Sequence, residues 1–312
     1  MNALNDTFHQ QVRTVASVQS LADRCQNGPL PEDYDEIVAL VGRFVAARLQ
    51  RPSEPLDEKH RAAIHSLFGD ALTTPDTMMG HVFAKPFGYA GDFQIIDKIY
   101  TLHEGRSTRA KRWDRFFHAQ AATQAVRNRK ELFKRLLRDK ASAGAVRVLD
   151  VASGPARDLE EFFSELPELA KNVEVQCVDM DAGAIAHAKS LLGTWNRRVS
   201  FTQANIFKYR SPEKYDLVWS AGLFDYFDDR TFMAVLRKCA KNVAPGGELV
   251  VGNFHPRNPT RPLMILQDWI LYHRTEEDLV RLAQEALGGE TACMVESEEE
   301  GVNLFLRVRG PV

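Results

Sequence analysis

The sequence predicts an α/β fold, in which a helical N-terminal extension precedes a doubly wound and mostly parallel sheet. Apolar residues recur at helical spacing through roughly the first 140 of the 312 residues. From Val146 onward, short β-branched runs alternate with helical patterns, which is typical of parallel strands joined by helices. We therefore expect a helical extension or lid over 1–140 and an α/β domain over 141–312.

Composition restricts the classes of partner. The 40 basic and 42 acidic residues give a net charge of −2, so no basic surface for nucleic acid or an anionic membrane is expected. No apolar run reaches the length of a membrane span, and the polar N-terminus lacks the apolar core of a secretory signal. The four cysteines lie far apart, which argues against a disulfide framework or a zinc site and favours a cytoplasmic location.

The extension is predicted to consist of helices separated by Pro- and Gly-containing breaks. The expected helices cover 4–24, 31–49, 57–68, 93–102 and one or two basic segments within 108–140. An Arg from the last of these, Arg129, is a candidate to reach over the first strand and bind a ligand carboxylate.

Residues 81–93 form an unusual loop, because glycines and a proline that favour turns are mixed with several aromatic side chains. So many aromatic residues lead us to expect that the loop folds inward. One interpretation is a hydrophobic plug with Asp92 as the N-cap of the next helix. The other is a lid over the active site, with Tyr89 and Asp92 facing a ligand. The residues alone favour neither.

The first strand begins at Val146 and ends at Asp150, and the small residues that follow predict a tight turn before a helix that starts at Arg157. Strand, small-residue turn and helix form the first unit of a doubly wound sheet, where ligands bind at the carboxyl ends of strands. Small side chains let the backbone approach a ligand, and the helix N-terminus offers N–H donors. The alternative is a close-packed turn with no ligand.

The second strand, 173–178, ends at Asp179, and an acid in this position can accept hydrogen bonds from ribose hydroxyls. Met180 can lie against an adenine face, and Asp181 is the expected N-cap of the next helix. Further strands are predicted over 199–203, 215–220 and 248–253, the last after a turn at 245–247, and a closing pair over 292–296 and 302–309.

In this order the pieces resemble class I S-adenosylmethionine-dependent methyltransferases, over about 147–309. The markers are Asp150 and Gly154, the ribose acid Asp179, Asn205 before Ile206, Tyr-Asp-Leu-Val-Trp-Ser at 215–220 and Val-Ala-Pro-Gly-Gly at 243–247. The resemblance implies a Rossmann-like sheet with an antiparallel last strand and S-adenosylmethionine as cofactor. The cofactor-binding residues would be Arg129, Asp150, Ala152, Ser153, Gly154, Asp179, Met180, Asn205, Ile206, Ser220, Ala221 and Gly222.

The chain departs from the family pattern at two places. Ala152 and Ala156 stand where glycines are common, and Asn205 stands where an Asp often contacts the adenine amino group. An Asn side chain can offer its carbonyl oxygen to the same donor.

Three further stretches narrow the resemblance. They are Lys-Pro-Phe-Gly-Tyr-Ala-Gly-Asp-Phe at 85–93, Ala-Gly-Leu-Phe-Asp-Tyr at 221–226 and Arg-Thr-Glu-Glu-Asp-Leu at 274–279. Together they look like a bacterial subgroup linked to the biosynthesis of 3-hydroxypalmitic acid methyl ester. This resemblance implies methylation of a small or lipid-like molecule.

Methyl transfer from a sulfonium is an in-line displacement, in which the protein holds the reactants in line and excludes water. A carboxylate acceptor needs no base, whereas an alcohol or protonated amine does. The candidates for catalysis are His255, at a strand end, with Tyr89 and Asp92. The candidates for substrate contact are Tyr226, Asn253, Trp269 and Tyr272, the last two on an expected helix within 257–274 where core packing is an equal alternative.

The prediction is thus a methyltransferase of a small molecule, with a carboxylate or hydroxyl oxygen as acceptor and a fatty-acid-derived molecule as a candidate substrate. An N-methyltransferase of a small metabolite and a non-catalytic S-adenosylmethionine-binding regulator are the alternatives. A nicotinamide-dependent oxidoreductase is disfavoured, because the chain lacks G-x-G-x-x-G.

Overall fold

The computed structural model describes residues 18–49, 66–289 and 291–310, and these form two compact units. The first unit contains the described residues up to Thr123 together with Pro259–Ile270, and the second contains Gln124–Asn258 and the residues from Leu271 onward. The helices predicted over 4–24 and 57–68 lie largely outside the described residues, and their described parts, 18–24 and 66–68, are helical.

The second unit contains a seven-stranded sheet in the order β3-β2-β1-β4-β5-β7-β6. The strands are β1 (Val146–Val151), β2 (Val173–Asp179), β3 (Val199–Gln203), β4 (Tyr215–Ser220), β5 (Val243–Phe254), β6 (Cys293–Ser297) and β7 (Asn303–Arg309). β1 to β5 are mutually parallel, whereas β7 runs antiparallel to both β5 and β6. The predicted fold class, including the antiparallel last strand, is confirmed. The carboxyl ends of β1 to β5 share one edge of the sheet, which we call the carboxyl edge.

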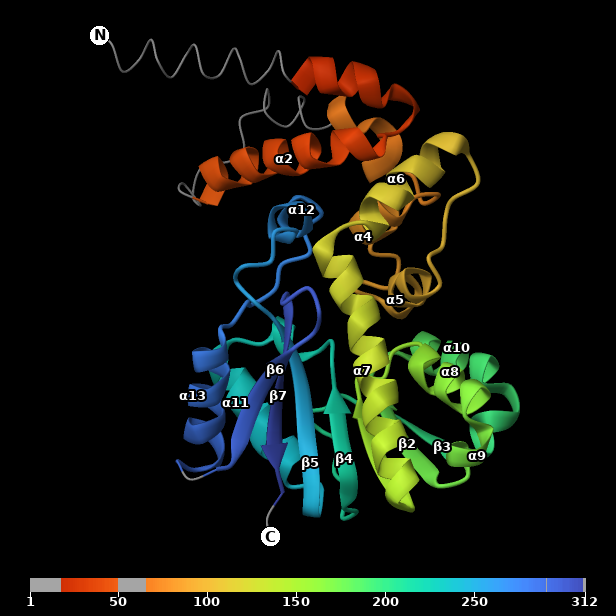
Figure 1. Cartoon of the computed structure of the whole chain (residues 1–312), viewed down its shortest axis with the longest axis vertical. Helices are drawn as coiled ribbons and strands as arrows, with labels where there is room; N and C mark the ends of the chain where they lie inside the picture. Colours follow the sequence, from red (N-terminus) through yellow and green to blue (C-terminus); the bar gives the residue numbers. More distant parts are fainter. Residues whose placement is uncertain (1–17, 50–65, 290, 311–312) are drawn as a thin grey trace. The chain divides into compact units, whose positions relative to one another are not determined.

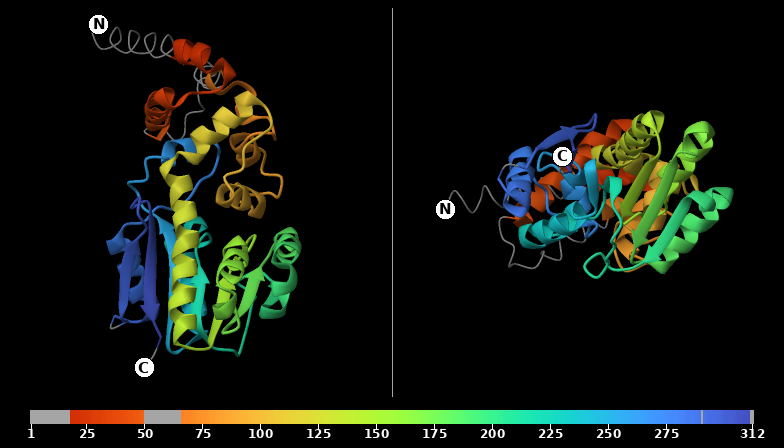
Figure 2. Two further views of the ribbon diagram at one scale, coloured as in Figure 1. Left: turned by 45° about the vertical axis from the view of Figure 1, so that its right-hand side comes forward. Right: turned by 90° about the horizontal axis from the view of Figure 1, so that it is seen from below.

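Helices cover both faces of this sheet, as Figure 1 and the view from below in Figure 2 show. One face packs against α7 (Ala121–Ala143), α8 (Arg157–Glu165) and α10 (Ala182–Leu192), and the other against α11 (Asp229–Ala240) and α13 (Glu276–Leu287). On the α7 face the rings of Phe133 and Phe305 stack on Trp219, with centroids 4.7 and 5.7 Å away. The short elements of this unit are α9 (Pro167–Ala170), η4 (Gly193–Arg198) and η5 (Phe224–Tyr226).

The structure corrects two predicted boundaries. β5 begins at Val243 and runs through the predicted 245–247 turn, and the β4–β5 register shifts between Tyr215 and Leu217 to accommodate it. The helix expected within 257–274 is only α12 (Arg261–Leu266), so Trp269 and Tyr272 follow it instead of lying on it. The helix ends because Asp268 adopts a left-handed conformation, with φ 57°.

The first unit is helical in its described part. Its elements are η1 (Cys25–Asn27), η2 (Pro31–Asp33), α2 (Tyr34–Leu49), η3 (Gly69–Leu72), α4 (Met78–Ala84), α5 (Phe93–Tyr100), α6 (Thr108–His118) and α12, which packs on α2. A buried carboxylate, Asp114, accepts the backbone N–H groups of Met78 and Gly105, each at 2.7 Å, and so joins α6 to the start of α4 and to the loop that precedes α6. Among the residues that the structure describes, no helix has the length and apolar character needed to cross a membrane.

The 81–93 loop is organised by Asp92, which is the N-cap of α5 as predicted. Its Oδ1 accepts from the backbone N–H groups of Gln94 and Ile95, each at 2.9 Å. The expectation that the loop folds inward is wrong for Phe83 and Phe87, which are exposed. Phe93 alone of the three phenylalanines is buried, because it starts α5 and packs into the unit, whereas the Phe87 ring rests on it with a centroid separation of 4.6 Å.

Candidate active site

The turn after β1 has a backbone conformation that is typical of turns where the chain approaches a ligand closely. Ala152, Gly154 and Ala156 all have positive φ, at 56°, 57° and 53°. Such angles are strained for residues that carry a Cβ, so two alanines adopt here a conformation that favours glycine. A Cβ built on Gly154 would meet no atom within 4 Å, which shows that the turn borders open space.

Asp179, at the end of β2, joins this turn to the second strand. Its Oδ2 accepts from the N–H of Gly154 and its Oδ1 from the N–H of Asp181, each at 2.9 Å. Burial raises the pKa of Asp179, against the effect of these backbone hydrogen bonds. Met180 is 68% exposed beside it, and Asp181 is the N-cap of α10 as predicted. An acid and an exposed apolar side chain therefore border the turn.

Two further acids are buried behind the turn. Burial, with the charges of Asp158 and Asp179, raises the pKa of Asp150 well above its usual value. Burial also raises the pKa of Asp158 to about 6, although the charge of Arg129 on α7 acts in the opposite direction. The sequence analysis did not select Asp158, whose position in the first turn of α8 resembles that of an ordinary helix-start acid.

Asn205 and Ile206 follow β3 and are half-buried. The Oδ1 of Asn205 accepts from the backbone N–H of Phe207 at 2.9 Å. This bond fixes the side chain, with its Nδ2 directed away from the Phe207 N–H. The carbonyl oxygen that we expected to contact an adenine amino group therefore already accepts one hydrogen bond.

Buried hydrogen bonds hold the end of β4 and the loop that follows it in place. The hydroxyl of Ser220, fully buried, donates to the carbonyl of Val151 at 2.9 Å. Arg129, also buried, donates from Nη1 to the carbonyl of Ala221 at 3.1 Å. A Cβ on Gly222 would lie 3.1 Å from that guanidinium, so the glycine provides room for Arg129. The predicted reach of Arg129 over the sheet is thus directed at the loop after β4.

Arg274 is the centre of a network at the end of β5. It donates to Oδ1 of Asn253 at 2.8 Å, to the carbonyl of Phe227 at 2.6 Å and to Asp229 at 2.9 Å. The amide nitrogen of Asn253 in turn donates to the carbonyls of Phe254 and Tyr272. Asn253, which we expected to contact substrate, uses both polar atoms within the protein, while Tyr226 and Tyr272 are exposed.

Asp225 belongs to the same network. Its Oδ1 accepts from the backbone N–H of Phe254 at 2.6 Å, and its carbonyl accepts from Tyr272 at 2.7 Å. Burial raises the pKa of Asp225 to about 7, and the charges of Arg129 and Arg274 only partly oppose this. The motif stretches at 221–226 and 274–279 therefore meet in space.

His255 directly follows β5 and is buried. Its Nδ1 accepts from the backbone N–H of Arg257 at 3.0 Å, and its Nε2 lies 3.3 Å from Oε2 of Glu276. Nδ1 therefore carries a lone pair and Nε2 the proton.

Sequence reasoning missed Asn303, at the start of β7 opposite Phe254. It is fully buried, and neither Nδ2 nor Oδ1 has a hydrogen-bond partner among the described residues. Side chains alternate along a strand, so Asn303 faces the same side as Phe305, the α7 face. Nearby, Glu298 accepts the N–H groups of Val302 and Asn303 through Oε1 and the amide of Asn128 on α7 through Oε2.

The remaining candidates belong to the first unit. Asp92 is fully buried, and its Oδ2 lies 2.9 Å from Nε2 of His81, whose Nδ1 accepts from Lys98 at 3.1 Å. Tyr89 is half-buried in the same loop, and Trp269 is buried after α12. Lys85 of this loop pairs with Asp268, so the loop and the segment that carries Trp269 are joined. The structure thus gathers the cofactor candidates and His255, Tyr226, Asn253 and Tyr272 in the second unit.

Comparisons with known proteins agree with this architecture. Residues 148–247 match the family model described as a methyltransferase domain. A crystal structure of a possible exported protein from Bordetella parapertussis superposes with a TM-score of 0.65 at 19% identity and covers 91% of this chain and 100% of that one. No curated protein matches the chain.

A second solved structure has a related fold. Magnesium protoporphyrin IX methyltransferase from Synechocystis, with bound S-adenosylhomocysteine, gives a TM-score of 0.51 at 14% identity and covers 75% of this chain and 99% of that one. At these identities the two structures show the fold alone. The domain match shows a methyltransferase domain, whose cofactor is S-adenosylmethionine, within the second unit on a sheet with this strand order.

The second unit fits this cofactor. The turn at Gly154 borders open space, Asp179 stands at the end of β2 to accept hydroxyl groups, and Met180 offers an exposed apolar surface. Each carboxylate oxygen of Asp179 has a second lone pair beyond its backbone bond, which leaves it able to accept from a ribose.

Proposed function

We propose that this methyltransferase acts on an oxygen of a small acceptor, a carboxylate before a hydroxyl, and that the acceptor is derived from a fatty acid. The observation that carries the proposal is the buried, unpartnered amide of Asn303 at the carboxyl edge. An unpaired buried amide costs about 1–3 kcal/mol, so it is expected to gain a partner when the enzyme works. Its Nδ2 can donate to an acceptor oxygen.

The cofactor supplies a methyl group on a positively charged sulfur. We propose that the twelve cofactor residues named above bind it, with Asp179 accepting the ribose hydroxyls and the turn at 152–154 offering backbone N–H groups. Arg129 adds a positive charge at the carboxyl edge, which favours an anionic acceptor over a protonated amine. Tyr226, Tyr272 and Trp269 supply apolar surface, while Asn253 holds the Tyr272 backbone.

Proton transfer is needed only for a hydroxyl acceptor. In that case we propose His255 as the base, which requires the lone pair of its Nδ1 to be released from the backbone N–H of Arg257. Tyr89 and Asp92 are proposed to act from the extension, with Asp92 holding the loop through its cap and its contact with His81. A carboxylate acceptor needs only binding and alignment.

The subgroup linked to 3-hydroxypalmitic acid methyl ester is a specific form of this proposal. It rests on the stretches at 85–93, 221–226 and 274–279, two of which meet through Arg274 and Asp225. We also propose that 1–140 acts as an extension or lid and 141–312 as the catalytic domain. We propose a cytoplasmic location, which suits three buried cysteines and a fourth, half-buried one that form no disulfide with one another.

The test is transfer of a radiolabelled methyl group to medium- and long-chain fatty acids and their 3-hydroxy derivatives, followed by mild alkali. A methyl ester releases volatile methanol, whereas a methyl ether or a methylated amine keeps the label. Label that mild alkali releases supports a carboxylate acceptor. Label that resists alkali and lies on a hydroxyl oxygen supports a hydroxyl acceptor. Label on nitrogen overturns the oxygen acceptor, and cofactor binding without any transfer favours the regulator.

Asn303→Leu tests the observation itself. The leucine removes an unpartnered polar group at similar volume, so the free energy of unfolding should stay equal or rise while kcat/KM falls about tenfold. Leu304→Met, a volume-conserving change at the next position on the opposite face, is the control. Equal activity of Asn303→Leu and the parent would refute a role in acceptor binding.

A further inference from the structure

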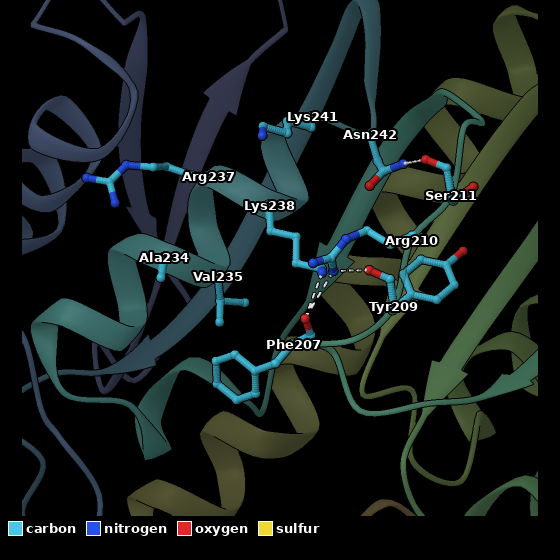
Figure 3. A pocket seen from close by; sticks show the side chains of 10 residues that line it. All are labelled: Phe207, Tyr209, Arg210, Ser211, Ala234, Val235, Arg237, Lys238, Lys241 and Asn242. Carbon is cyan, nitrogen blue, oxygen red and sulfur yellow. Dashed lines mark hydrogen bonds between the residues drawn. The ribbon is translucent and has the colours of Figure 1, made fainter.

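A pocket of about 500 Å³ lies between the 204–214 segment and α11 (Figure 3), and its lining includes none of the cofactor or acceptor candidates named above. Cavities of 300–1,000 Å³ commonly hold small ligands. Nothing in the proposed methyl transfer uses this pocket, although Phe207 on its wall directly follows Asn205 and Ile206.

The lining is strongly basic. Arg210, Arg237, Lys238 and Lys241 line the pocket, and no acidic side chain does. None of these four cations has a carboxylate within ion-pair distance among the described residues, although the chain holds slightly more acids than bases. The nearest acids in sequence are engaged elsewhere, since Glu213 pairs with Arg147. The cluster is therefore a local excess of positive charge, without a counterion supplied by the chain.

Backbone carbonyls hold the cations in place. Arg210 donates from Nη1 to the carbonyls of Phe207 and Tyr209, at 3.0 and 2.8 Å, and Lys238 donates to the carbonyl of Phe207 at 3.1 Å. Figure 3 shows Arg210 and Lys238 converging on this carbonyl while Arg237 extends away. Neutral acceptors fix both positions without cancelling the charge, and Lys238, Arg210 and the unbound ammonium of Lys241 keep N–H groups to donate.

Apolar surface adjoins these donors. Val235 and Ala234 of α11 line the same pocket, and the ring of Phe207 is 47% exposed at its wall. A ligand that satisfies both features carries a multiply charged anion on an apolar or aromatic body. A phosphate group supplies two charges and three acceptor oxygens, which suits the flat guanidinium of Arg210 and the ammonium of Lys238.

We propose that this pocket binds a small organic phosphate, with the phosphate on Arg210 and Lys238, the charge of Lys241 nearby on its lining and the apolar body against Phe207. The site is independent of the methyl acceptor, so its test requires no methyl transfer.

The experiment is isothermal titration of the full chain with phenyl phosphate, inorganic phosphate and phenol. Phenyl phosphate should bind at one site and more tightly than inorganic phosphate, and phenol should not bind measurably. Added salt should weaken the binding, because exposed charges are screened.

The Lys238→Gln/Lys241→Gln variant should lose about tenfold or more in affinity for phenyl phosphate. Lys171→Gln/Lys189→Gln is the matched control, since it removes two charges of the same kind from exposed lysines of the same unit. Circular dichroism checks that each variant is folded. No binding by the unaltered chain, or equal affinity in the double variant and the control, overturns the proposal.

Discussion

Individual carboxylates give the clearest tests, and the first concerns the acid at the end of β2. Asp179→Asn replaces one accepting oxygen by an amide nitrogen that faces the N–H of Gly154 or Asp181. Hydrogen bonds to a charged group contribute about 1.5–3 kcal/mol, so affinity for S-adenosylhomocysteine should fall about ten- to a hundredfold. Titration calorimetry measures this. Glu174→Gln, on the exposed side of the same strand, should bind like the parent.

The second carboxylate, Asp225, makes stability depend on pH. Because its pKa is raised to about 7 in the folded state, the folded chain binds a proton more tightly than the unfolded chain does. The free energy of unfolding should therefore fall as pH rises from about 4 to about 7, and should level off outside that range. Asp158, with a pKa of about 6, acts in the same direction, so a variant is needed to isolate Asp225.

Asp225→Asn keeps an oxygen that can accept from the N–H of Phe254 and removes the buried charge. As pH rises, the free energy of unfolding of this variant should increase relative to that of the parent, and the difference should reach about 4 kcal/mol at pH 8. Urea unfolding between pH 4 and 8 measures the difference. Asp139→Asn, which removes an exposed carboxylate from α7, is the control for loss of one carboxylate. If the unfolding free energies of Asp225→Asn and the parent changed equally with pH, the assignment of the raised pKa to Asp225 would be contradicted.

Among the elements, α5 depends most on a single side chain. Asp92→Ala removes its N-cap and leaves Nε2 of His81 buried without an acceptor. The expected loss is about 2–4 kcal/mol of unfolding free energy in the first unit, measured by urea unfolding. Asp92→Asn keeps an accepting oxygen and should lose less, which makes it the variant for testing turnover. An Asp92→Ala protein as stable as the parent would show that the cap is dispensable.

The helices and strands differ in how well local sequence patterns predict their bounds. β3 and β4 have the predicted bounds because alternation and β-branched residues are local signals, and the caps at Asp92 and Asp181 follow from residue type. The segment after β5 was misjudged, since its apolar spacing is helical while Asp268 breaks the helix. Its packing on α2 in the first unit depends on residues more than 200 positions away.

For the molecule as a whole, we expect S-adenosylhomocysteine, the product formed from the cofactor, to stabilise the second unit selectively. S-adenosylhomocysteine at a hundred times its Kd should add about 2.7 kcal/mol and raise Tm by roughly 4–8 °C. Hydrogen exchange should slow in peptides covering 150–158 and 179–184 of the second unit, and should be unchanged in α2. NAD at the same concentration is the control and should change neither quantity. Protection confined to the first unit would place the cofactor elsewhere.

The sequence by itself determined the α/β class, the order of the strands along the chain and the small-residue turn with Asp179, because these depend on neighbours within one strand or turn. The tertiary structure decided that Arg274 binds Asn253 and the loop after β4, and that Pro259–Ile270 joins the first unit. It alone revealed Asn303 and the basic pocket. Strand alternation predicts which face a side chain occupies, whereas a hydrogen-bond partner or an opposing charge comes from segments distant in the chain.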